Sequence, residues 1–390
     1  MLQGWPLTFG AGVALFVLGI LVGRALTLAV DRRKERGASG ERPHYLLGLN
    51  YLISNQPDLA MAELSQAVRG ETDAIEAYLA LGNLFREKGQ VERAIDIHKS
   101  LLHRAQITEL GRMQALFSLG LDFKKAGLVD RAERTLLELV RRDPENLSGW
   151  HCLGKVYEEM GRWPEAIEIQ QRIQSLADAR DHRLLASLWT AQGRQALADG
   201  NHASALSHFQ TALRLDATYE PARIGAGDCL MQEGDTQGAL AQWESALGDN
   251  AAWAGDALLR MAAACEGTED LERLEAACSS VLERHPSSWR AMSVQASLYR
   301  ERGEGEHARE ALTNALFERP GSLTVQRSLW QTFAEESKDW AEFGNLLDRA
   351  SREAKLVDPY VCLRCGFKST QAFPRCPHCH EWNTLAEEQA

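Results

Sequence analysis

The chain has 390 residues, of which 45% are hydrophobic, a formal net charge of −11 and eight cysteines. This composition is normal for a folded protein, and no segment has the low complexity typical of disorder. The negative charge argues against a general nucleic-acid-binding protein, because such proteins need a basic face to neutralise phosphates. A chain of this length ordinarily has more than one domain, but a repeat solenoid can use it as one continuous body.

The N-terminal residues 1–30 are predicted to form a single transmembrane anchor. The stretch from Leu7 to Gly23 is uncharged and mostly apolar, and its 17 residues span roughly 25 Å as a helix. No positive residue precedes this stretch and no A-x-A site follows it, so a cleaved signal peptide fits the sequence less well. The basic residues all come after it: Arg24, Arg32, Arg33, Lys34 and Arg36. The positive-inside rule therefore places the chain after the anchor in the cytoplasm, with a few N-terminal residues on the other side of the membrane.

Residues 31–43 are predicted to be a basic juxtamembrane segment and polar linker, and a repeated pattern follows them. In this pattern a small residue is followed seven positions later by Gly, and five positions after that by Ala. It occurs at Gly82–Gly89–Ala94, Gly120–Gly127–Ala132, Gly154–Gly161–Ala166, Gly193–Gly200–Ala205, Gly227–Gly234–Ala239 and Ala296–Gly303–Ala308. The period is close to the value of about 34 residues that marks tetratricopeptide (TPR) arrays. We therefore predict an all-α solenoid of about nine helical hairpins over residues 44–356.

Each predicted hairpin has two antiparallel helices, A and B, with the second Gly of the pattern in the turn between them. The first small residue lets the two helices approach closely, and large apolar side chains fill the space around it. Pro144, Pro286 and Pro320 fall just after helix B, where proline can end a helix. Two spacings, Gly82 to Gly120 and Gly154 to Gly193, exceed 34 residues. We expect looser connections there, near residues 106–112 and 175–183. The predicted core side chains include Tyr78, Leu81, Phe85, Leu136, Leu139, Trp150, Leu153, Tyr157, Phe209 and Trp243.

The array contains no recognisable catalytic motif. A phosphate-binding Gly loop, an H-E-x-x-H motif and a G-x-S-x-G motif are all absent from the sequence. The histidines of the array stand singly and are expected to be exposed or structural. Cys152, Cys229, Cys265 and Cys278 are scattered through it and are expected to be core residues of a protein in a reducing compartment. The sequence thus favours a binding protein over an enzyme.

The C-terminal residues 357–390 are predicted to form a small metal-binding domain. Two Cys-x-x-Cys pairs, Cys362 with Cys365 and Cys376 with Cys379, are separated by ten residues. Each tight turn lets two thiolates face one ion, so that two pairs provide a tetrahedral site for zinc or iron. About 30 residues cannot build a sufficient core, so metal binding and folding of this tail should be coupled. Unligated core cysteines and a redox dithiol are the alternatives, and the paired spacing makes both a poorer fit.

The tail is similar to a rubredoxin, on the residues Tyr360-Val361 before the first pair and Cys376-Pro377 in the second. It departs from the rubredoxin pattern in having His380 after the second pair, where Gly is usual, and in its short connection between the pairs. Both departures favour a structural or docking module over electron transfer. His378 and His380 are further candidate ligands, but four cysteines already complete a metal shell.

An N-terminal anchor, a TPR array and a rubredoxin-like tail in this order resemble the lipopolysaccharide assembly protein B (LapB, or YciM) family. The resemblance covers essentially the whole chain. It implies a non-enzymatic adaptor that acts with the membrane-bound AAA+ protease FtsH. It also implies that the adaptor promotes degradation of the deacetylase that commits precursors to lipid A, and so restrains lipopolysaccharide synthesis. The four tail cysteines carry over as metal ligands.

Two other functions remain open on the sequence. A non-proteolytic scaffold would assemble lipopolysaccharide synthesis or export proteins at the inner membrane, and a redox protein would use iron in the tail. The sequence does not decide between iron and zinc, nor between a monomer and a homo-oligomer. It also does not tell whether the tail docks on the array.

Overall fold

A computed structural model describes residues 44–70, 74–178, 180–266, 270–336 and 360–387. The predicted anchor (1–30), the segment 31–43 and the predicted junction of array and tail lie outside the described residues. Among the helices that are described, none is long and apolar enough to cross a membrane. Contacts within the chain divide it into two compact units, Met1–Val156 and Tyr157–Ala390.

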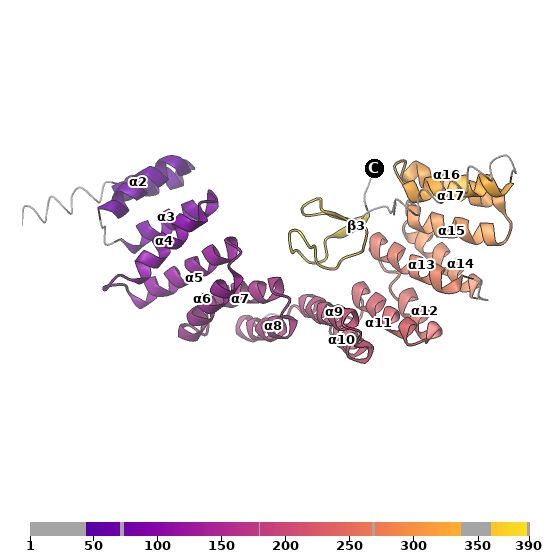
Figure 1. The fold of residues 1–390 in the computed structure, drawn as a ribbon, viewed down its shortest axis with the longest axis horizontal. Coiled ribbons are helices and arrows are strands. Elements are labelled where there is room, and N and C mark those ends of the chain that lie inside the picture. The colour runs from indigo at the N-terminus through magenta and orange to yellow at the C-terminus, as the bar shows by residue number, and fades with distance from the viewer. Residues whose placement is uncertain (1–43, 71–73, 179, 267–269, 337–359, 388–390) are drawn as a thin grey trace, which may run out of the picture. The chain divides into compact units, whose positions relative to one another are not determined.

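The first unit consists of helical hairpins. Residues 44–53 are helical and precede α2 (Pro57–Arg69). The hairpin of α3 (Ile75–Glu87) and α4 (Val91–Leu102) comes next, followed by that of α5 (Glu109–Lys125) and α6 (Val129–Arg142). Helix α7 (Leu147–Glu159) begins in this unit and ends in the second. Contacts of α2 with α3 and of α4 with α5 join neighbouring hairpins, as in a solenoid (Figure 1).

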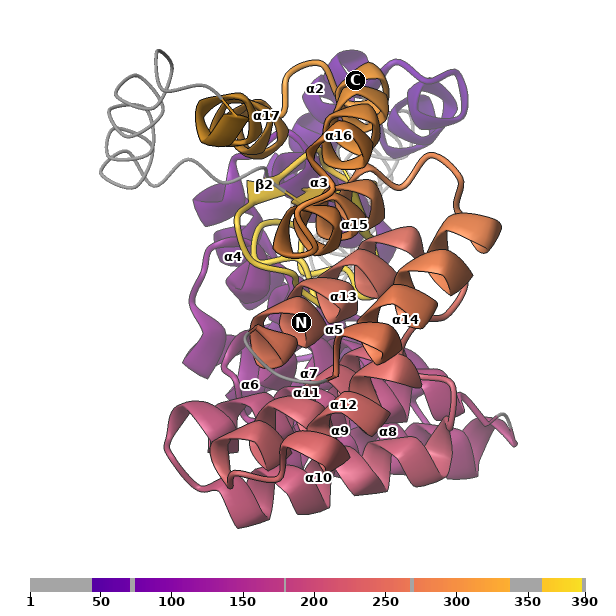
Figure 2. The same cartoon turned by 90° about the vertical axis from the view of Figure 1, so that its right-hand side faces the viewer.

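The second unit continues the same architecture. Figures 1 and 2 show its hairpins stacked in chain order, and contacts between consecutive helices agree with this. The helices are α8 (Trp163–Ala177), α9 (His182–Ala198), α10 (His202–Leu215), α11 (Glu220–Gln232), α12 (Thr236–Glu244), α13 (Ala251–Cys265), α14 (Leu271–Arg284), α15 (Trp289–Glu301), α16 (Gly305–Glu318) and α17 (Leu323–Glu336). The prediction of a TPR-like helical array is thereby confirmed for the described residues.

The second Gly of the repeated pattern lies in the turn of each hairpin, as predicted. All six of these glycines have positive φ, between 68° at Gly161 and 86° at Gly234. The amide of the next residue then donates to the carbonyl five positions before it, for example Asp235 to Leu230 at 2.9 Å. This Schellman arrangement satisfies carbonyls left free at the end of helix A, and glycine adopts the required backbone conformation without steric cost.

The first small residue of the pattern allows close packing of the two helices. A Cβ atom at Gly227 would lie only 2.4 Å from Nε1 of Trp243 on the facing helix. The large side chains predicted for the core are buried, except that Trp150 is half-buried. Its indole N–H donates to the carbonyl of Pro144 at 2.9 Å, so this ring covers the turn before its own helix.

The two long spacings have a different structural basis from the expected looser connections. Helices α5 and α9 each have 17 residues, whereas α3, α7, α11 and α15 have 13. Most of the additional residues therefore form an extra turn at the start of helix A. Thr108 and Asp181 cap these longer helices by accepting hydrogen bonds from Gly111 N–H and Leu184 N–H.

The prolines that were predicted to follow helix B do so. Helices α6, α14 and α16 end two residues before Pro144, Pro286 and Pro320, respectively.

The tail forms a small antiparallel sheet in the order β2-β1-β3. Its strands are β1 (Tyr360–Cys362), β2 (Lys368–Ser369) and β3 (Leu385–Glu387). Strand β1 pairs Tyr360 with Ser369 on one side and with Glu387 on the other. Strand β3 also contacts α13, so the sheet lies against the array within the second unit (Figure 1).

Candidate metal centre

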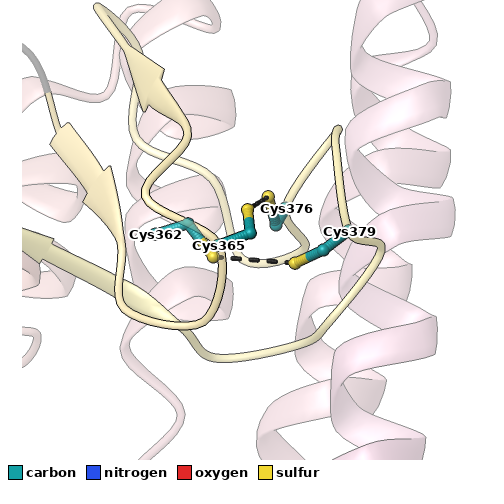
Figure 3. A group of neighbouring side chains, drawn as sticks. All are labelled: Cys362, Cys365, Cys376 and Cys379. Atoms are coloured by element: carbon teal, nitrogen blue, oxygen red, sulfur yellow. Dashed lines mark hydrogen bonds between the residues drawn. The ribbon is translucent and has the colours of Figure 1, made fainter.

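The four tail cysteines meet at one point, as Figure 3 shows. All four sulfur atoms lie within 4.8 Å of one another. Sγ of Cys362 is 3.7 Å from Sγ of Cys379, and Sγ of Cys365 is 3.7 Å from Sγ of Cys376. None of the cysteines in the chain is in a disulfide. A tetrahedral ion with metal–sulfur bonds of about 2.3 Å places its sulfurs about 3.8 Å apart, so this donor set fits one such ion.

The backbone of each Cys-x-x-Cys turn directs N–H groups at sulfur. Cys362 accepts hydrogen bonds from the backbone N–H groups of Arg364 and Cys365, and its Sγ forms a hydrogen bond with the Thr384 hydroxyl, whose oxygen is 3.1 Å away. Burial alone would raise the pKa of Cys362, but these donors outweigh it and lower the pKa to about 6. One thiolate therefore forms readily in this turn, which is the species that binds metal.

Cys365 and Cys379 do not ionise as easily, because the pKa of each thiol is raised. A backbone hydrogen bond from Glu381 lowers the pKa of Cys379, but burial and the three neighbouring cysteines outweigh it and raise the pKa to about 12. Four thiolates in one cluster repel each other, so their joint ionisation requires a cation between them. The pattern of pKa shifts thus agrees with a site for a metal ion.

The residue after each cysteine pair has a positive φ: 72° at Gly366 and 59° at His380. His380 thus occupies the backbone position where glycine would fit without strain. The ring of His378 stacks on Phe367 with centroids 6.0 Å apart. Among the described residues, the only cluster of potential ligands is the one formed by the four cysteines.

The tail docks on the array through several polar contacts in the second unit. Tyr360 donates from its hydroxyl to Asp256 of α13 at 3.0 Å, and the guanidinium of Arg290 covers its ring at 4.2 Å. Tyr219, just before α11, donates to the Asn383 side chain at 3.0 Å. Trp382 Nε1 donates to the carboxylate of Glu158 at 3.0 Å.

Apolar burial accompanies these polar contacts. Six tail residues share one buried hydrophobic cluster with side chains of α11 to α15: Tyr360, Cys362, Ala372, Phe373, Cys376 and Leu385. The tail and this part of the array therefore have a common core. The docking residues were not found from the sequence, because their partners are far apart in the chain and follow no local pattern.

The other predicted residues have structural positions. Cys152, Cys229, Cys265 and Cys278 are buried in the array, as expected. His98 is not isolated, however: it is fully buried, and its Nδ1 lies 2.5 Å from Oδ2 of Asp122. Arg86 donates to the other oxygen of Asp122 at 2.9 Å, so this cluster ties α3, α4 and α5 together. The cluster is thus a buried polar contact that helps to pack these three helices.

The fold and the cysteine cluster define a class of protein: a TPR array that carries a C-terminal rubredoxin-like metal domain. Family models support both parts. The model described as rubredoxin metal binding domain matches residues 360–387, and tetratricopeptide repeat models match residues 77–110, 146–218 and 196–260.

Comparison with curated proteins finds relatives that match array and tail together. Lipopolysaccharide assembly protein B of Escherichia coli (strain K12) is 25% identical over 367 residues, which is 92% of each chain. The protein of the same name from Haemophilus influenzae is 26% identical over 354 residues, covering 87% of this chain and 88% of that one. A TPR protein of Cytophaga hutchinsonii has a solved structure that is 14% identical, with a TM-score of 0.42, covering 73% of this chain and 99% of that one. The chain is therefore similar to lipopolysaccharide assembly protein B over most of its length.

Proposed function

We propose that the chain is a membrane-anchored cytoplasmic adaptor that regulates lipopolysaccharide biosynthesis at the bacterial inner membrane. In this proposal it promotes proteolysis, by FtsH, of the deacetylase that commits precursors to lipid A. The observation that carries the proposal is the match of array and tail together to proteins named for lipopolysaccharide assembly, over 92% of both chains. The array holds other proteins, and the chain performs no chemistry of its own.

We further propose Cys362, Cys365, Cys376 and Cys379 as the ligands of one structural ion, iron or zinc. The metal supplies the charge that four adjacent thiolates need, and its role is to fold the tail. Metal analysis of purified protein, together with its absorption spectrum, decides the identity, because iron–thiolate centres absorb visible light and zinc centres do not. An absorption band that bleaches reversibly in step with an activity would instead favour the redox function.

The proposed anchor makes such an adaptor more effective. Two proteins held at the same membrane meet at a higher effective concentration than two proteins free in solution. A variant that lacks residues 1–30 should therefore be folded and soluble but lose its regulatory effect at native abundance. Full regulation by this soluble variant at the native level would count against the anchor.

The half-life of the deacetylase is the decisive measurement for the proteolysis step. We expect it to increase several-fold when the gene for this chain is removed, and to return to the original value when the gene is restored. The matched control is a strain with inactive FtsH, in which removal of the chain should change nothing further. An unchanged half-life in the first strain would favour the non-proteolytic scaffold.

A further inference from the structure

A small cavity lies where the tail meets α8 and α9 in the second unit. Its volume is about 260 Å³. One wall comes from the array and the other from the tail, so the cavity exists only while the tail is folded and docked. We call this cavity the seam pocket. It is lined by Trp163, Ala191, Arg194, Phe373, Pro374, Arg375, Cys376, Pro377 and Trp382.

The walls of the seam pocket are mostly flat and apolar. The rings of Trp163 and Trp382 meet edge to face with centroids 6.2 Å apart, and Phe373, Pro374 and Pro377 add further apolar surface. Aromatic and proline surfaces of this kind accept an aromatic or large aliphatic side chain, because such contacts remove apolar area from water without leaving a polar group unpaired.

The polar lining of the seam pocket is cationic. It contains two guanidinium groups and no carboxylate. Arg375 is already engaged, since it donates from Nη1 to the backbone carbonyl of Glu158 at 3.1 Å and has Nε 3.6 Å from the Glu158 carboxylate. It also lies 5.9 and 5.7 Å from the ring centroids of Trp163 and Trp382, so it helps to hold the two rings in place.

Arg194 differs from Arg375 in having no carboxylate within ion-pair distance among the described residues. It is exposed, and its hydrogen bond within the second unit is a long one, 3.4 Å, to the carbonyl of Ala372. Although solvent reaches the side chain, the crowding of protein atoms around it, and then the nearby cation of Arg260, lower the pKa of Arg194. A cation in such surroundings gains more from an incoming carboxylate than one that is fully hydrated.

The acidic groups nearest to Arg194 are committed elsewhere. Asp228 and Asp256 line the neighbouring cavity, and each has an oxygen 2.7 Å from the guanidinium of Arg260. Arg194 lines that cavity as well, but among the described residues no carboxylate lies within ion-pair distance of it.

We propose that the seam pocket binds a segment of a partner protein in which an aromatic or large aliphatic side chain stands next to a carboxylate. The apolar side chain fits against Trp163 and Trp382, and the carboxylate pairs with Arg194. The inference rests on the proposed role of the array in holding other proteins. It adds that metal is needed for this binding, since the tail supplies half of the pocket.

The test begins with a library of random dodecapeptides displayed on phage, selected on the purified full-length, metal-loaded chain in detergent. We expect the enriched peptides to pair Asp, Glu or the terminal carboxylate with Phe, Trp or Leu within two positions. The most enriched peptide is then synthesised with a fluorescent label, and its affinity is measured by fluorescence polarisation. Enrichment of peptides without this pairing, or no enrichment, overturns the proposal.

Variants locate the binding site. Arg194→Ala should weaken binding at least tenfold and Arg194→Lys less, whereas Arg172→Ala, which removes an exposed arginine of α8, should leave it unchanged. The double variant Cys362→Ser with Cys365→Ser should abolish binding. Equal affinity of Arg194→Ala and the unaltered chain would overturn the proposal, as would binding without the folded tail. Failure here would leave the half-life of the deacetylase unaffected, so the two proposals fail separately.

Discussion

Tyr219 joins the tail to the array through a single hydroxyl group. The side chain is fully buried, and its hydroxyl lies 2.9 Å from Oγ of Ser187 on α9 and 3.0 Å from Oδ1 of Asn383 in the tail. Burial raises the pKa of Tyr219, so the phenol stays protonated and keeps its donor. Asn383 has a φ of 56°, a conformation that asparagine tolerates better than most residues, and its side chain accepts the hydrogen bond.

Substitution of Tyr219 by Phe therefore tests the docking contact at one atom. The ring still fills its space, but Asn383 loses a buried partner, and we expect a loss of about 1–2 kcal/mol. Chemical denaturation, followed by circular dichroism, measures the effect on the second unit. Tyr51→Phe, at a half-buried position in the first unit, is the control and should be nearly neutral. Equal effects of both substitutions would contradict the role of the hydroxyl.

Within one hairpin, the fit between the small residue of helix A and the large residue of helix B decides how closely the helices approach. Trp243 is 3% exposed, its ring lies against Gly227, and its N–H points at the carbonyl of Ile224 at 3.3 Å. The ring is rigid and enclosed, so it cannot move away from an added methyl group.

Gly227→Ala should accordingly destabilise the hairpin of α11 and α12. Alanine favours the helix by up to about 1 kcal/mol, but overpacking against the buried indole costs about 1–3 kcal/mol, so the net effect is a loss. Gly321→Ala is the matched control, because a Cβ there meets no atom within 4 Å. The midpoints of thermal unfolding of the two variants give the comparison. A stabilised Gly227→Ala variant would show that the helices adjust their distance freely.

These hairpins could be predicted from the sequence because their determinants are local. A glycine with positive φ and a small residue seven positions before it are both needed within one hairpin, so they recur with the repeat. The extra turn of α5 and α9 was not predicted, since the additional residues suit a helix and a loop equally well. The docking of the tail on the array was not predicted either. Tyr360 and Asp256 are 104 positions apart, and each side chain alone looks like an ordinary polar residue.

At the scale of the molecule, the tail and helices α11 to α15 share one hydrophobic core. The cysteine cluster orders the tail, and the ordered tail adds Tyr360, Phe373 and Leu385 to the core of α11 to α15. Loss of metal thus removes more than the tail, because it exposes apolar side chains of the array and leaves Asp256 without the Tyr360 hydroxyl. In the first unit, helices α2 to α5 form hydrophobic clusters that contain no residue of the tail.

Removal of the metal should therefore loosen the second unit selectively. We expect chelation to accelerate hydrogen exchange by more than tenfold in residues 360–387, and to a lesser extent in α13, which contacts β3. Helices α3 to α6 should exchange at unchanged rates, and far-ultraviolet circular dichroism should show nearly full array helicity. Adding zinc back should restore protection, and the double variant Cys362→Ser with Cys365→Ser should exchange fast with or without the chelator. Unchanged exchange in α13 after the tail has lost its protection would mean that the array is fully stable without its docked partner.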